Sequence, residues 1–292
     1  MANTFISIQE IARQALPRLI ENLVFPNLVH KDFSSDFVLG KGATVQVRKP
    51  VVLVANDFDA STGTTAQGIT EQSETVTLDK LATVDAEWGA VEGATSVDDI
   101  NRLFIEPAAY AIAEKINADG LALAKSAGNS LTIGSAAGNV SGLDVFAAAG
   151  AALNKEKAPL TERYGIWSPK DTAAFQTIPA LVNAEKSGTT EALRNGSIGK
   201  VFGIENYMAQ GVATDSTNSV NVVFNKNAFA FVTRPLAAPS GVESYTTSYN
   251  GISLRVTRGY DMKYKKEMIS MDVLYGYKVM YPKLAVKVLS AK

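Results

Sequence analysis

The chain has 292 residues, of which 46% are hydrophobic, and its formal net charge at pH 7 is -1. This size and composition predict a globular protein with a large buried core, in one large domain or two smaller ones, and exclude a disordered chain. The sequence has no apolar run of about 18 residues, no signal-peptide pattern at its start and no cysteine, so we expect no membrane span, no disulfide and no thiolate metal site or nucleophile.

Charge is distributed unevenly along the chain. Residues 56–119 hold 13 acidic and 3 basic side chains, whereas residues 251–292 hold 9 basic and 3 acidic ones. Such asymmetry is typical of surfaces that meet a partner of opposite charge, but within one chain the two stretches can equally face each other. Both interpretations stay open at this point.

The N-terminal segment has apolar residues at helical spacing, with Pro17 inside the pattern. The spacing predicts an amphipathic helix that is kinked or broken at the proline and lies on another element. Its apolar residues are Phe5, Ile8, Ile11, Ala15, Leu19 and Leu23.

Two β-rich stretches flank a polar segment. Residues 43–55 are rich in β-formers but contain Pro50, and residues 76–88 alternate between apolar and polar, which predicts one long strand with a solvated face. Residues 56–75 between them are nearly free of apolar side chains, and compact domains rarely carry such a loop without a use. We therefore predict a long β-arm that projects from the body and gains its burial from another molecule.

A long helix is predicted after the arm. Thr95 or Ser96 can cap it, and Pro107 interrupts its middle, either as a kink or as the first residue of a second helix. From Pro107 to Ser126 it spans about 30 Å at 1.5 Å per residue. Its apolar face consists of Val97, Ile100, Phe104, Ala108, Ile112, Ile116, Leu123 and Ala127.

The second half alternates helices and strands. Residues 141–159 predict a helix with Ser141 and Asp144 at its start, residues 163–167 a short buried strand, and residues 168–176 a helix that Ser168 caps. Further strands are predicted at residues 220–224, 228–232, 252–257 and 268–281. The fold class is α+β, with a mixed sheet and helices.

Catalytic and ligand-binding motifs are incomplete. His30 is the only histidine and is interpreted as structural, and residues 40–44 lack the first glycine of a phosphate loop. Asp57 and Asp59 begin like a calcium loop whose turn glycine and closing glutamate are missing, which leaves at most a weak surface cation. We predict no catalytic, cofactor or metal site.

Charged side chains of the arm and of the C-terminal stretch are therefore predicted to contact other subunits. The hypothesis is that the acidic arm of one subunit lies across a neighbour whose surface includes the basic stretch. Burial then supplies affinity, and charge supplies register. The candidate contact residues are Asp57, Asp59, Glu71, Glu74, Asp79, Asp85, Glu87, Trp88, Arg255, Arg258, Lys263, Lys265 and Lys266.

Four stretches carry a resemblance to a known family in the order in which the family has them. They are residues 94–124, with the small-residue run after Pro107, and residues 191–212, 221–239 and 249–289. Together they resemble the major capsid proteins of tailed bacteriophages, which share the Hong Kong 97 coat fold.

The resemblance implies a division into parts. It makes residues 1–44 an N-terminal arm and residues 45–93 an extended β-hairpin, the E-loop. Residues 94–139 with 241–292 become a peripheral domain that contains a long spine helix. Residues 140–240 become a mixed α/β axial domain.

The resemblance also implies a structural, non-enzymatic function. Copies of the chain are expected to form hexamers and pentamers of an icosahedral shell around double-stranded DNA, in a virion assembled in the host bacterial cytoplasm. Expected partners are further copies of the chain, a portal, decoration proteins and either a separate scaffolding protein or none, with non-specific contact to DNA and no membrane. Lys49 and Lys80 are candidates for covalent cross-linking by position only, and we expect no such chemistry.

Two alternatives belong to other classes. A tail-tube or decoration subunit is also a virion assembly protein but is expected to lack the long helix between arm and body. A hydrolase with a carboxylate site is expected to show a pocket in which acidic side chains converge.

Overall fold

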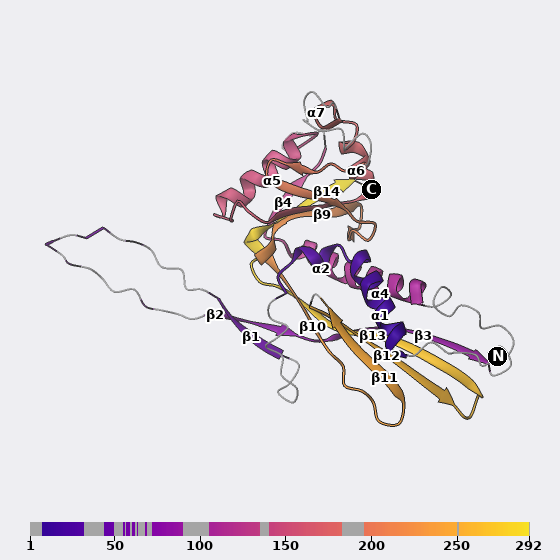
Figure 1. Ribbon diagram of the computed structural model, residues 1–292. Helices are drawn as coiled ribbons and strands as arrows, with labels where there is room; N and C mark the ends of the chain where they lie inside the picture. Colours follow the sequence, from indigo (N-terminus) through magenta and orange to yellow (C-terminus); the bar gives the residue numbers. More distant parts are fainter. Residues whose placement is uncertain are drawn as a thin grey trace.

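The structure is a computed structural model that describes residues 8–31, 44–49, 72–89, 105–134, 140–182, 196–249 and 251–291, with a few isolated positions between 55 and 68. Two sheets lie on either side of a layer of helices, and a two-stranded hairpin projects to one side of the body (Figure 1). The described part of the chain is therefore α+β, as predicted.

The first sheet is built around its longest strand, β13. β3 pairs antiparallel with one edge of β13, β12 and then β10 pair with the other edge, and β11 pairs with β12. The strands are β3 (Lys80–Gly89), β10 (Phe229–Arg234), β11 (Glu243–Tyr249), β12 (Ile252–Asp261) and β13 (Lys266–Val279).

The second sheet is mixed, as the alternation of elements predicted. Its order is β4-β14-β9-β5-β7-β6, with β8 also on β9; the β4–β14 and β5–β7 pairs are parallel and the other pairs antiparallel. The strands are β4 (Asn129–Thr132), β5 (Arg163–Trp167), β6 (Lys200–Val201), β7 (Ile204–Met208), β8 (Thr214–Asp215), β9 (Asn218–Asn225) and β14 (Ala285–Ala291).

Helices fill the space between the sheets and cover the second sheet from outside (Figure 1). The inner layer contains α1 (Ile8–Asn22), α2 (Phe25–Leu28), α4 (Glu106–Leu121) and the 3-10 helix η3 (Ala122–Ser126). The outer helices are α5 (Asp144–Lys155), α6 (Pro169–Phe175) and α7 (Pro179–Val182), and short 3-10 helices η4 (Lys226–Ala228) and η5 (Pro282–Leu284) join strands.

The largest core cluster lies between the sheets. Phe25 of α2 is fully buried, and its ring centroid lies 5.6 Å from that of Phe224, 5.5 Å from that of Phe229 and 5.8 Å from that of Tyr277. Because Phe224 belongs to the second sheet and Tyr277 to the first, this aromatic group joins the layers. A second cluster, around Phe146, Trp167 and Phe175, holds α5 and α6 on the second sheet.

The predicted N-terminal helix is confirmed over its described length. Pro17 lies inside α1, and the helix continues past it to Asn22, so the proline does not break it. Ile11, Ala15 and Leu19 are buried, as expected, while Phe5 lies outside the described residues. The helix packs on α4 and on strands β11 and β12.

The long helix is also confirmed in its described part. Ala108, Ile112 and Ile116 are buried on one face, and Pro107 lies in the first turn of α4, as the first-residue alternative proposed. The predicted caps and the apolar residues from Val97 to Phe104 lie outside the described residues. In the second half, Ser168 caps α6 by accepting a hydrogen bond from the backbone N–H of Asp171.

Candidate inter-subunit surfaces

The projecting hairpin consists of β1 (Thr44–Lys49) and β2 (Gln72–Thr77), which pair antiparallel with Thr44 opposite Thr77 and Lys49 opposite Gln72 (Figure 1). The side chain of Val76 is fully buried at the base of the hairpin. It belongs to a small apolar cluster with Leu78, Ala230, Val232 and Met280. Among the described residues of the arm, those at its base fix it to the body.

A close backbone approach defines where the arm leaves the body. Residues 77 and 78 pass directly over Gly276 of β13, and a Cβ at this position would overlap the carbonyl oxygen of Thr77. An ion pair between Lys278 Nζ and Glu74 Oε2, at 3.4 Å, lies beside this crossing. Glycine is required here because the two backbones leave no space for a side chain.

The interpretation of residues 76–88 as one arm strand is wrong. The chain leaves β2 after Thr77, breaks at Leu78 and Asp79, and begins β3 at Lys80 with a different partner. β2 pairs with β1 in the arm, whereas β3 pairs with β13 in the body's own sheet. The predicted alternation itself is correct, since Leu78 and Ala82 are buried while Asp79 and Asp85 are exposed.

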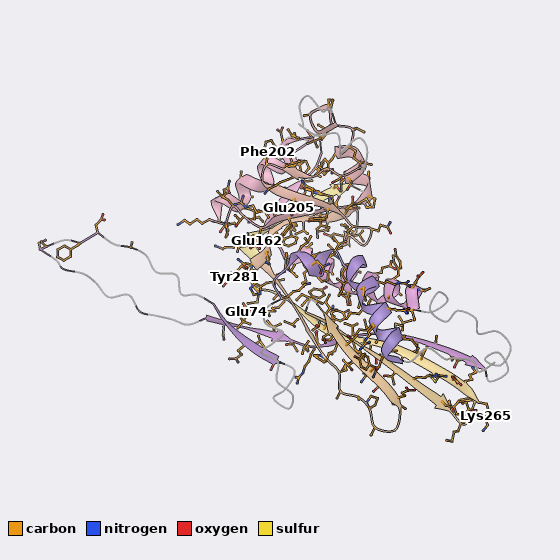
Figure 2. The ribbon with its side chains drawn as sticks, viewed as in Figure 1. Glu74, Glu162, Phe202, Glu205, Lys265 and Tyr281 are labelled. Carbon is orange, nitrogen blue, oxygen red and sulfur yellow. The ribbon has the colours of Figure 1, made fainter. Side chains whose placement is uncertain are left out.

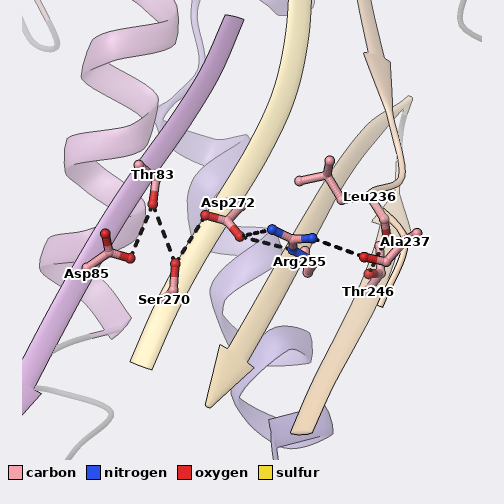
Figure 3. Close-up of polar contacts among 8 residues, drawn as sticks. All are labelled: Thr83, Asp85, Leu236, Ala237, Thr246, Arg255, Ser270 and Asp272. Atoms are coloured by element: carbon pink, nitrogen blue, oxygen red, sulfur yellow. Dashed lines mark hydrogen bonds and ion pairs between the residues drawn. The ribbon is translucent and has the colours of Figure 1, made fainter. Parts of the chain in front are cut away.

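A row of polar side chains crosses the outer face of the first sheet (Figure 3). Thr83 of β3 contacts Asp85 and Ser270, and Ser270 donates to Asp272 at 3.1 Å. Asp272 is paired with Arg255 of β12, whose two nitrogens lie 3.0 and 2.6 Å from Oδ2. The row spans the strands that carry the acidic and the basic candidates.

The end of this row is fixed by the segment that links β10 to β11. Arg255 Nη1 donates to the carbonyl oxygen of Ala237 at 3.0 Å, and Thr246 Oγ1 donates to that of Leu236 at 3.1 Å (Figure 3). Arg255 thus connects the sheet to this segment, while its charge is balanced within the chain by Asp272.

The β12–β13 hairpin carries the basic candidates to the far end of the first sheet, where Figure 2 labels Lys265. Lys263 and Lys265 are exposed at its turn. Met262, just before Lys263, is 77% exposed, and Tyr264, between the two lysines, is 63% exposed. This basic, apolar tip is a surface suited to contact with another molecule.

Part of the charge asymmetry is resolved within the chain. Lys266 forms an ion pair with Glu87 of β3, and Arg258 pairs with Glu267 at 2.6 Å. With the Lys278–Glu74 pair, these contacts support the alternative in which acidic and basic stretches face each other. Exposed pairs of this kind contribute only about 0–1 kcal/mol each.

The remaining candidates of the acidic stretch lie at different places in the structure. Asp57 is exposed in the connection between β1 and β2, whereas Asp59 and Glu71 lie outside the described residues. Trp88 pairs through its backbone with Glu267. The structure thus brings Glu74, Glu87 and Lys266 into ion pairs within the chain and leaves Asp57, Lys263 and Lys265 exposed.

A polar cluster links the start of β3 to the end of α4. Asp119 accepts a hydrogen bond from Tyr275 at 2.6 Å and one from Lys115 at 3.0 Å, and Lys80 Nζ lies 3.3 Å from Oδ2. Burial opposes ionisation of Asp119, but the hydrogen bonds from Tyr275 and Lys115 and the charges of both lysines outweigh it and lower its pKa. The same burial and carboxylate raise the pKa of Tyr275.

The described residues contain no group of three or more His, Asp or Glu side chains that could hold a metal ion. His30 lies beside β10, where its N–H donates to Phe229 and its carbonyl accepts from Phe231. No helix within the described ranges has both the length and the apolar character needed to cross a membrane.

Two exposed features were not predicted from the sequence. Leu160 is 74% exposed in the loop between α5 and β5, and a pocket beside α4 has Tyr110 and Met208 at its rim. A single apolar residue in a loop carries no periodic signal, so the sequence pattern did not indicate Leu160. The pocket forms between α4 and β7, which are far apart in the sequence, so local periodicity did not indicate it either.

Comparisons with known proteins identify the fold. Neither a protein-family model nor a curated protein matches this sequence. A solved structure from Mycobacterium phage Che8 superposes with a TM-score of 0.68 and 20% identity over 91% of this chain and 90% of that one. The capsid structure of the cyanophage P-SCSP1u superposes with a TM-score of 0.65 and 17% identity, over 92% of this chain and 88% of that one.

A third structure supports the same assignment. The asymmetric unit of the mature capsid of bacteriophage PhiM1 superposes with a TM-score of 0.61 and 11% identity, over 86% of this chain and 83% of that one. In each case the match covers most of both chains. The chain therefore has the fold found in phage capsid structures.

Proposed function

We propose that this chain is the structural major capsid protein of a tailed bacteriophage. Many copies form hexamers and pentamers of an icosahedral shell that encloses double-stranded DNA, and the protein has no enzymatic role. The observation that carries this proposal is a capsid fold matched over most of its length, with an arm whose strands β1 and β2 extend beyond their own body (Figure 1).

The arm supports assembly because, among its described residues, the burial in its own chain is at the base. An isolated two-stranded hairpin is marginally stable in water. Contact with a neighbouring copy supplies the burial that such a hairpin lacks. The long helix α4 between arm and body is the feature that a tail protein was expected to lack, so its presence favours a shell subunit over a tail-tube or decoration subunit.

In this proposal the parts of the chain keep the division that the resemblance implies. Residues 94–139 with 241–292 form the peripheral domain, with α4 as its spine helix, and residues 140–240 form the axial domain. Both sheets take strands from more than one of these ranges: β3 and β10 pair with β13 in the first sheet, and β4 and β14 join the second sheet. The N-terminal arm is residues 1–44, and the E-loop is residues 45–93.

The contact candidates divide into two groups. Asp57, Asp59, Glu71 and Glu74 belong to the arm and its base. We place them against the basic tip of a neighbour, which contains Lys263 and Lys265. Asp79, just before β3, remains a further candidate, together with these residues of the first sheet: Asp85, Glu87, Trp88, Arg255, Arg258 and Lys266.

Other partners follow from the role of a shell. A portal, decoration proteins and, where present, a separate scaffolding protein bind the assembled copies, and packaged DNA is contacted without sequence specificity. The mature protein is part of the virion, and it is synthesised and assembled in the host bacterial cytoplasm.

Negative-stain electron microscopy and sedimentation of the purified chain test the proposal. We expect closed shells of uniform size when the protein is concentrated at moderate salt. Open tubes support the tail-protein alternative. Monomers at all protein and salt concentrations contradict self-assembly, and turnover of an ester, phosphate or glycoside substrate contradicts the absence of enzymatic activity.

A further inference from the structure

A pocket of about 220 Å³ opens beside the middle of α4. Val24 and Ala113 line its apolar interior, Tyr110 and Met208 stand at its rim with 51% and 50% of their surface exposed, and Glu114 brings one negative charge to it. Large apolar side chains around a pocket are typical of a site that another molecule covers.

An apolar side chain of suitable character is exposed elsewhere on the chain. Leu160 is 74% exposed in the loop of residues 156–162, which joins α5 to β5. The two residues at positive φ in this loop, Lys157 at 57° and Glu162 at 53°, hold the backbone in a conformation that L-amino acids rarely adopt. The loop therefore presents Leu160 at a conformational cost within its own chain.

A buried arginine fixes this loop. Arg163 is 4% exposed; its Nε donates to the carbonyl oxygen of Pro159 at 2.7 Å, and its Nη2 donates to that of Ala158 at 2.8 Å and to the side chain of Asn154 at 2.7 Å. The backbone on the N-terminal side of Leu160 is thus held before any contact forms. A pre-organised apolar residue is a favourable anchor for binding, because little conformational freedom is lost.

The loop and the pocket lie at opposite ends of one pair of strands. β5 and β7 are parallel, with Arg163 opposite Ile204 and Trp167 opposite Met208. Leu160 precedes the first residue of β5, whereas Met208 at the pocket rim is the last residue of β7. The two features of one chain therefore face different neighbours in the arrangement proposed below. Glu162 lies on the side of the body from which the arm projects (Figure 2).

We propose that Leu160 of one copy inserts into the α4 pocket of the next copy. This proposal rests on the proposed function and adds a specific contact to it. Because different surfaces of the chain meet, the contact is head-to-tail and builds a ring when the rotation between copies closes. The loop contact and the arm then engage the same neighbour, since both leave the body on one side (Figure 2).

Charge favours Leu160 over the other exposed apolar residues. Glu156 and Glu162 of this loop form ion pairs with Lys283 and Lys226 of the same chain. Lys155 and Lys157, both exposed, therefore give the surface beside Leu160 a positive charge that suits the negative rim of the pocket at Glu114. Phe202 is also exposed on this side, but the cross-strand pair of Lys200 and Glu205 next to it carries no net charge (Figure 2).

The exposed hairpin tip is a weaker candidate for the same pocket. Its turn lies at the end of the first sheet, where Lys265 is labelled on the side away from the arm (Figure 2). A ring contact needs complementary surfaces on opposite sides of the subunit. The loop of residues 156–162 meets this condition.

Disulfide trapping tests the contact directly, because the chain has no natural cysteine. The variant Leu160→Cys with Met208→Cys is assembled and then oxidised, and its chains are separated on a non-reducing gel. We expect a ladder of covalent multimers that a reductant collapses to monomer. Each single-cysteine variant, and the pair Leu160→Cys with Met262→Cys, serves as a control and is expected to give no ladder.

The outcomes separate this contact from the proposed function. Assembled particles of the Leu160→Cys, Met208→Cys variant that give no ladder overturn the contact and leave the capsid role intact. Failure of the unsubstituted chain to form particles overturns the capsid role itself. A ladder in the Met262→Cys control shows that the trapping is not specific and also overturns the contact.

A second variant tests the energetic role of Leu160. Because Leu160 is exposed in the subunit, Leu160→Asp is expected to leave the circular dichroism spectrum and melting temperature unchanged and to raise the protein concentration needed for assembly about 10-fold or more. Leu160→Met is expected to assemble like the natural chain. Assembly of Leu160→Asp at the natural concentration contradicts the proposal.

Discussion

The hydroxyl of Tyr275 donates a 2.6 Å hydrogen bond to Oδ2 of Asp119, and this bond joins the longest strand of the first sheet to the end of α4. Lys80, the first residue of β3 after the arm, contacts the same carboxylate oxygen. One ionised carboxylate therefore links the long helix, the sheet and the base of the arm.

Replacement of Asp119 by Asn is predicted to destabilise the subunit by about 1–2 kcal/mol at pH 7, because hydrogen bonds to a charged acceptor are stronger than those to a neutral one. Folding lowers the pKa of Asp119. Its contribution is therefore complete above the unfolded-state pKa of about 3.9 and is lost as the pH falls through the folded-state pKa. Thermal melting of both proteins from pH 7 to pH 3 should show curves that converge in acid; a constant difference contradicts this role.

The helices and most strands follow from local patterns. Ile112 and Ile116 recur at the spacing of one helical face, and both are buried where the pattern placed them. The alternation in residues 76–88 likewise identified the buried face. It did not reveal the change of partner at Leu78, because a period of two is the same whichever strand lies alongside.

The candidate surfaces were less predictable. Lys266 and Glu87 are far apart in the sequence, and only the pairing of β3 with β13 brings them together. The sequence therefore located the charges but did not decide which charges are balanced within the chain. Leu160 owes its fixed position to Arg163, whose contacts with nearby carbonyl oxygens depend on the loop conformation.

Substitution of Gly276 by Ala is predicted to displace the base of the arm, because the new methyl group overlaps the backbone of Thr77. We expect a loss of about 1–3 kcal/mol in the free energy of unfolding, the range for overpacked sites, together with weaker assembly. Gly150→Ala in α5 is the matched control: a Cβ there meets nothing within 4 Å, so that variant should gain about 0.5–1 kcal/mol. Equal melting temperatures for the two variants contradict the crossing as described.

Truncation of the apolar face of α4 is predicted to destabilise the subunit. Ile112 and Ile116 are 1% and 0% exposed, and each change to Ala should cost about 2–5 kcal/mol. Urea unfolding measures this cost, with Ala111→Ser on the exposed face of the same helix as control. Unchanged unfolding of the double variant shows that this face is not core.

The ion pair between Glu87 and Lys266 is predicted to act within the subunit. Glu87→Lys should lower stability by about 1 kcal/mol or less, since both side chains are substantially exposed, and added Lys266→Glu should recover the loss. Melting in low and high salt tests this, because salt screens the repulsion in the single variant. The exchanged pair presents reversed charges to a neighbour, so normal assembly of that variant removes both residues from the inter-subunit candidates.

A shortened arm is predicted to separate folding from assembly. Lys49 and Gln72 are directly paired in β1 and β2, so replacement of residues 50–71 by Asn-Gly closes the hairpin with a two-residue turn and keeps its base. The buried cluster around Val76 and the crossing over Gly276 remain.

We expect this variant to fold like the natural chain in circular dichroism and melting, and to sediment as a monomer under conditions in which the natural chain forms shells. The physical reason is that the described base contacts, which hold the arm on its own body, come from residues outside 50–71 and are kept, whereas the removed residues are those that we propose to be buried between subunits. A matched variant that replaces Phe58, 73% exposed in this connection, by Ser keeps the length and tests whether an apolar contact at that position contributes. Shells of natural size from the shortened chain contradict the proposed role of the arm, whereas loss of the folded monomer places residues 50–71 in the core of their own subunit.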